Sequence, residues 1–119
     1  MAAKSIFSQI IAGEIKSDIL YEDNDFIVIK DIRPQAPIHL LVITKKPYRT
    51  LEEVSLEDTA LHAGLLQVAR KMAKEQGIAD NYKLVLNVGE QMQEVRHIHL
   101  HVLGGWEAIN EAATGKVSP

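Results

Sequence analysis

The sequence predicts one α+β domain over residues 1–119, with a five-stranded antiparallel sheet, one long helix on a face of that sheet and a short N-terminal helix. Two observations predict this class. The elements run in the order helix, three strands, long helix and two strands, and no linker or internal repeat divides them. The hydrophobic share of 46% and the charged share of 24% are typical of a globular chain that buries one core.

The first half of the chain contains the short helix and three strands. Residues 5–12 have apolar side chains at helical spacing, so they predict a helix. Residues 19–21 and 26–29 are apolar runs separated by polar turn residues, which indicates a hairpin. Because prolines cannot donate to a strand ladder, 31–37 is a loop. The almost wholly apolar segment 39–44 then predicts a strand that is covered on both faces.

The second half contains the long helix and the last two strands. Residues 55–58 have the form of a helix capping box, and Gly77 ends the helix that follows. One face of this helix is apolar and carries Leu61, Leu65, Val68 and Met72. Residues 82–88 and 95–103 predict the two strands. The core of the domain therefore covers 5–105, and 106–119 is a tail without clear periodicity.

Composition and charge argue against several classes of protein. The formal net charge of -3 provides no basic face, so no nucleic-acid partner is expected. The longest apolar stretch, 36–43, is too short to span a bilayer, and the N-terminal residues lack the apolar run of a signal peptide. The absence of cysteine excludes disulfides, thiolate catalysis and cysteine-based zinc sites. We therefore expect a cytoplasmic protein without a membrane partner.

Three histidines at alternate positions are the most informative feature of the sequence. His97, His99 and His101 alternate with apolar residues in the segment predicted as the last strand. Because side chains alternate faces along a strand, the three imidazoles are expected to share one face, about 6.5 Å apart. Three polar rings at such positions would weaken a core without any gain in packing, so the pattern indicates function rather than structure.

This row of three imidazoles suits nucleophilic chemistry near neutral pH, where imidazole titrates. A neutral imidazole nitrogen can attack phosphorus and form a covalent intermediate, provided that the other nitrogen donates to a nearby acceptor. A second imidazole can then stabilise the phosphoryl oxygens or protonate the leaving group. Two alternatives remain open. One is a set of merely structural histidines, and the other is a zinc site on two histidines two positions apart, for which the strand offers no carboxylate.

The alternation of histidine and apolar residues over 97–103 resembles the signature of the histidine-triad (HIT) superfamily. Other stretches resemble one branch of it, the HINT-like purine nucleoside phosphoramidases. They are the N-terminal residues Ile6, Phe7, Ile10 and Ile11, the segment 31–39 with the sequence DIRPQAPIH, the pair Asn87 and Gly89, and the pair Gly104 and Gly105. The resemblance covers about residues 5–105.

The resemblance implies a homodimer whose two sheets join into one continuous sheet. It also implies hydrolysis of purine nucleoside 5′-phosphoramidates or related acyl-nucleotides to the nucleoside monophosphate, with no cofactor or metal. His99 would be the nucleophile that becomes nucleotidylated, His101 would contact the phosphate and the leaving group, and His97 and His39 would orient the row. The nucleotide-binding residues it implies are Asp31 at the ribose, Asn87 at the α-phosphate, Gln93, Val95, and an apolar base pocket of Ile6, Phe7, Ile10, Ile29 and Ile32.

The sequence departs from this branch over residues 90–96. This stretch is one residue shorter than is usual and lacks a glycine pair, which would allow close approach of backbone N–H groups to a phosphate. Glu94 stands where a small hydroxyl residue often binds phosphate, and Arg96 replaces an aromatic residue. Two further functions therefore stay open: a nucleotide-binding or scaffolding protein with weak activity, and a dinucleoside polyphosphate hydrolase of the same superfamily.

Overall fold

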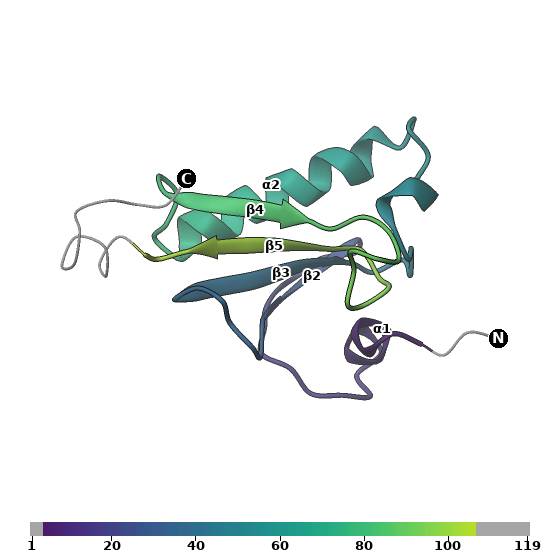
Figure 1. Ribbon diagram of the computed structural model, residues 1–119, viewed down its shortest axis with the longest axis horizontal. Coiled ribbons are helices and arrows are strands. Elements are labelled where there is room, and N and C mark those ends of the chain that lie inside the picture. Colours follow the sequence, from purple (N-terminus) through teal and green to yellow (C-terminus); the bar gives the residue numbers. More distant parts are fainter. Residues whose placement is uncertain (1–3, 107–119) are drawn as a thin grey trace.

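The computed structural model describes residues 4–106. This part of the chain contains five antiparallel strands in the order β1-β2-β3-β5-β4 and two α-helices, so the predicted α+β class is confirmed. In chain order the elements are α1 (Ile6–Ile11), β1 (Ile19–Glu22), β2 (Phe26–Lys30), β3 (Ile38–Thr44), the single-turn 3-10 helix η1 (Leu51–Glu53), α2 (Thr59–Glu75), β4 (Tyr82–Leu86) and β5 (His99–Gly104). The last strand of the described residues, β5, thus lies inside the sheet, between β3 and β4 (Figure 1).

The sheet separates two apolar clusters, and α2 and α1 lie on its opposite faces (Figure 1). On one face the apolar side of α2 packs on the strands, and Leu65, Val68 and Met72 are buried there as the periodicity predicts. On the other face, Phe7 and Ile10 of α1 cover a smaller cluster. The interior of β3 is buried because its residues contribute alternately to both clusters.

The long helix begins later than predicted. The capping box predicted over 55–58 is wrong, because Asp58 alone is the N-cap of α2 and accepts the backbone N–H of Leu61 at 3.0 Å. Ser55 belongs to the preceding turn, where its carbonyl accepts the N–H of Asp58. At the other end the prediction is confirmed, since Gly77 has φ +76°, the left-handed conformation that ends a helix.

The last strand also begins later than predicted. The strand expected over 95–103 is wrong for its first four residues, because β5 begins at His99. Just before it, the carbonyl of Ile98 still accepts the N–H of Thr44 in β3 at 3.4 Å, but the N–H of Ile98 donates to the carbonyl of Tyr48 at 2.9 Å. His97 therefore lies outside the strand ladder, so the alternation of faces along a strand does not explain its position.

The remaining predictions about the course of the chain concern β4 and the tail. The strand expected over 82–88 ends at Leu86. Of the tail 106–119, the structure describes only Trp106, whose ring centre lies 5.3 Å from the ammonium of Lys83, and 107–119 fall outside the described residues. Neither α-helix within residues 4–106 combines the length and the apolar content that a membrane span requires.

Candidate active site

Four imidazoles lie close together on the face of the sheet that α1 covers, and two of them contact Phe7. The ring centre of His99 lies 5.0 Å from that of Phe7 and 5.0 Å from that of His101. His39, on the neighbouring β3, lies 5.1 Å from His101, and His97 lies 6.0 Å from Phe7. The structure thus brings together all four histidines that the sequence singled out, and only His101 among them is appreciably exposed.

The backbone fixes the tautomer of His99. Its Nδ1 lies 2.7 Å from the carbonyl oxygen of His97. Because a carbonyl oxygen only accepts, Nδ1 must carry the hydrogen and donate it. The lone pair of a neutral His99 is therefore on Nε2, which has no hydrogen-bond partner within the described residues. This is the arrangement that a nitrogen nucleophile needs.

A second series of hydrogen bonds fixes the tautomers of His39 and His101. The backbone N–H of Gln35 donates to Nδ1 of His39 at 3.0 Å, so the neutral His39 ring carries its hydrogen on Nε2. That Nε2–H donates to Nδ1 of His101 at 2.8 Å. His101 consequently carries its own hydrogen on Nε2, and this atom is available to donate to a phosphoryl oxygen or a leaving group.

Burial keeps this part of the row neutral. It lowers the pKa of His39, and the nearby carboxylate of Asp31 opposes that shift. It also lowers the pKa of His101 to about 4, with further lowering by His99 and His39. Near pH 7 both rings are therefore neutral, as the tautomer assignments above require.

Asp31 lies closer to the histidines than the sequence indicated. Its Oδ2 is 3.4 Å from Nε2 of His39, and its Oδ1 accepts the backbone N–H of Arg33 at 2.8 Å. Donor atoms of Asp31, His39 and His101 lie within 4.8 Å of one another. The carboxylate that β5 lacks therefore comes from the loop before β3. A metal on Nε2 of a neutral His39 would need the hydrogen on Nδ1, where the N–H of Gln35 already points. The three side chains therefore fit the hydrogen bond from His39 to His101 better than they fit a cation.

The residues expected around the nucleotide fall into two groups. Phe7 and Ile10 of α1 are buried together with Ile29 of β2, between α1 and the sheet. Val95 packs against the same cluster. The remaining ones are more exposed. Ile6 is 42% exposed and Ile32 is 84% exposed, and Asn87 is half-buried just after β4. The structure thus places part of the predicted base pocket in the core and part on the surface.

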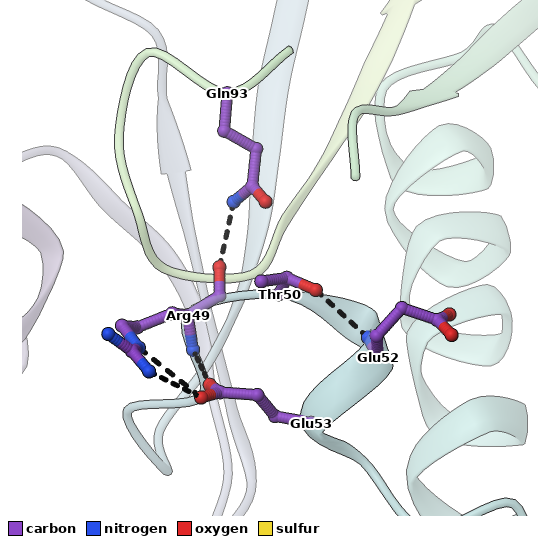
Figure 2. Close-up of polar contacts among 5 residues, drawn as sticks. All are labelled: Arg49, Thr50, Glu52, Glu53 and Gln93. Atoms are coloured by element: carbon purple, nitrogen blue, oxygen red, sulfur yellow. Dashed lines mark hydrogen bonds and ion pairs between the residues drawn. The ribbon is translucent and has the colours of Figure 1, made fainter. Parts of the chain in front are cut away.

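Gln93 has a role that sequence reasoning missed. Its buried amide joins three backbone segments: Oε1 accepts the N–H of Gly89 at 2.9 Å, and Nε2 donates to the carbonyls of Arg49 at 2.8 Å and Val95 at 3.2 Å. Figure 2 shows Gln93 reaching the carbonyl of Arg49, whose guanidinium is held by Glu53. Gln93 therefore anchors the loop that precedes the histidines, and no local pattern in the sequence signals this.

Comparison with known proteins identifies the family. The family model described as "Scavenger mRNA decapping enzyme C-term binding" matches residues 4–111. The purine nucleoside phosphoramidase of Escherichia coli (strain K12) is 45% identical over 107 residues, which cover 88% of this chain and 90% of that protein.

Solved structures agree with the sequence comparison. A HIT family hydrolase from Legionella pneumophila is 45% identical, with a TM-score of 0.80 over 84% of this chain and 91% of that one. A histidine triad protein from Clostridium difficile is 32% identical, with a TM-score of 0.82 over 100% of this chain and 96% of that one. The fold, the identity over most of the chain and the matching family model together show that this chain belongs to the histidine-triad (HIT) family.

Proposed function

We propose that the chain hydrolyses purine nucleoside 5′-phosphoramidates or related acyl-nucleotides through a nucleotidyl intermediate on His99. The observation that carries the proposal is the tautomer of His99, whose Nδ1 donates to the carbonyl of His97 and leaves the Nε2 lone pair free. The 45% identity to a purine nucleoside phosphoramidase supports the substrate class.

In the first step, Nε2 of His99 attacks phosphorus, a nitrogen–phosphorus bond forms and the bond to the leaving nitrogen breaks. The departing amine takes up one proton, which Nε2 of His101 donates and regains from water. In the second step, water displaces the imidazole, which releases the nucleoside monophosphate, regenerates His99 and returns two protons to solvent. Neutral His101 suits the donor role, because its Nδ1 already accepts from His39.

The remaining predicted residues belong to the same proposal. Asp31 would bind the ribose hydroxyls with whichever oxygen is not turned to Arg33, and Asn87 would contact the α-phosphate. The purine would lie against the apolar residues of α1 and its neighbours. The proposal also includes a homodimer with one continuous sheet, for which an edge strand, β1 or β4, must supply the joint.

Hydrolysis of adenosine 5′-phosphoramidate by the wild type and by His99→Ala, with chelator present, tests the proposal. We expect AMP from the wild type and none from His99→Ala, with AMP binding retained by both. His62→Ala is a matched control, because His62 lies on α2 and its ring bonds the carbonyl of Asp58. AMP release by purified His99→Ala would exclude His99 as the nucleophile.

The intermediate itself can be trapped by mixing enzyme with substrate and denaturing the sample in base, which preserves a phosphorus–nitrogen bond on histidine. The expected product is a peptide containing His99 with one added nucleotidyl group. If a folded wild-type protein binds AMP but releases none from the phosphoramidate, the proposal fails. In that case a nucleotide-binding or scaffolding function is favoured, and residues 90–96 are where the cause should be sought.

A further inference from the structure

The ring of His97 is held at both nitrogens, although this residue lies outside the strand ladder. Its Nε2 is 2.6 Å from the carbonyl oxygen of Thr44, so Nε2 carries the hydrogen. Its Nδ1 is 2.8 Å from the hydroxyl of Ser5 and 3.3 Å from that of Ser8, both on or next to α1. Since His97 is only 1% exposed, these protein groups rather than water are its partners.

The backbone of His97 in turn holds the proposed nucleophile. Its carbonyl oxygen accepts the Nδ1–H of His99 at 2.7 Å. Because β5 begins only at His99, the peptide that bears this carbonyl lies outside the strand ladder, and its N–H, that of Ile98, donates to the carbonyl of Tyr48 at 2.9 Å. The N–H of His97 makes a local bond to the carbonyl of Val95, so the two hydrogen bonds of the His97 ring act together with that Ile98 bond to tie this residue to distant parts of the fold.

The hydroxyl of Ser5 acts in two places. Its oxygen accepts the backbone N–H of Ser8 at 3.0 Å and so caps α1, while its hydrogen is donated to Nδ1 of His97. Phe7 of the same helix contacts the His99 ring edge-on, with 5.0 Å between ring centres. The start of α1 and the orientation of the nucleophile are therefore connected through one side chain.

We infer that Ser5 is a positioning residue for His99: its hydroxyl fixes the ring of His97, whose carbonyl then holds His99 in the tautomer with a free Nε2. The effect on turnover rests on the proposed function, but the effect on the two tautomers does not. Removal of the hydroxyl should lower kcat about fivefold, the factor that one hydrogen bond of about 1 kcal/mol corresponds to, with KM changed less.

Four variants separate donation to His97 from capping of α1. Ser5→Ala removes both, and the double variant with Ser8→Ala also removes the second hydroxyl near the same nitrogen. Ser5→Asp keeps a capping oxygen but cannot donate, and Ser5→Thr keeps both functions. Asp58→Ala is the matched control, because it removes the N-cap of α2 on the opposite face of the sheet.

The measurements are kcat and KM for adenosine 5′-phosphoramidate, and two-bond ¹H–¹⁵N correlation spectra that report the tautomers of His97 and His99. We expect lower kcat and mixed tautomers in Ser5→Ala, its double variant and Ser5→Asp, wild-type behaviour in Ser5→Thr, and lower stability alone in Asp58→Ala. Wild-type tautomers in the double variant, or wild-type behaviour of Ser5→Asp, would overturn the inference. If the wild type has no activity, the proposed function fails, and the spectra still decide whether Ser5 sets the tautomers.

Discussion

Substitution of Gln93 by alanine should destabilise the protein, because the amide of Gln93 is a buried junction between backbone segments. Its side chain is 8% exposed and makes hydrogen bonds to the N–H of Gly89 and to the carbonyls of Arg49 and Val95. Alanine makes none of them. The two residues before Gln93 are exposed, so water reaches part of the vacated space.

The magnitude follows from these three bonds. A buried backbone group left without a partner costs about 1–3 kcal/mol, and a group that water reaches costs much less. We therefore expect the free energy of unfolding to fall by about 2 kcal/mol. For a chain of 119 residues with an unfolding entropy of about 2.1 cal/mol/K per residue, this corresponds to a Tm lowered by about 8 °C.

Thermal and urea unfolding followed by circular dichroism measure this change. Arg49→Ala is the control, because Gln93 bonds the backbone carbonyl of Arg49, as Figure 2 shows, and truncation leaves that carbonyl in place. It removes only the exposed ion pair with Glu53, which contributes little to stability because water screens both charges. The reasoning is refuted if Gln93→Ala matches the wild type, or if Arg49→Ala is equally destabilising.

Three further predictions concern the packing of Gly64, the pKa of His101 and the metal content of the protein. Gly64→Ala should destabilise by about 1–3 kcal/mol in urea unfolding, because the new Cβ would lie 2.5 Å from Cε2 of Phe26; a more stable variant would contradict this packing. The free energy of unfolding should rise with pH from about 4 to 6.5 and then level off. The reason is that the pKa of His101 is lowered to about 4 in the folded protein, which therefore binds fewer protons than the unfolded chain in this range. Urea unfolding at several pH values measures this change, and a flat profile would refute it. Elemental analysis of protein purified without added metal should find no stoichiometric zinc, and turnover should survive chelator; a stoichiometric metal would reinstate the Asp31–His39–His101 cluster as a cation site.

The apolar patterns predicted most of the fold, because the positions of apolar residues along a segment show directly which of its faces will be buried. The continuous run in β3 is covered on both faces, and the helical repeat of α2 faces the sheet. The start of β5 could not be predicted in this way. Residues 95–98 have the composition of a strand, but the N–H of Ile98 bonds the carbonyl of Tyr48 and the N–H of His97 bonds locally to Val95. A pattern within one segment does not reveal such partners.

The candidate site was predicted in part for the same reason. Alternation places His99 and His101 on one face, whereas His97 reaches the row through contacts with Ser5 and Thr44. Asp31 was predicted at the ribose, but its approach to His39 was not, because Asp31 lies in a loop that folds back so that its N–H bonds the carbonyl of His39. Contacts between segments far apart in the chain decide such details.

The position of β5 has a consequence for the order in which the molecule is made. His39 and His101 meet across 62 positions of sequence, and within residues 4–106 β4 has β5 as its only neighbour in the sheet. A chain still emerging from the ribosome can form the β1–β2–β3 meander by local contacts, but it presents an unpaired apolar edge on β3 until β5 arrives. Pairing of β5 closes that edge, gives β4 its partner and brings His101 beside His39. Recovery of catalysis during refolding should therefore report the completion of the sheet rather than its beginning.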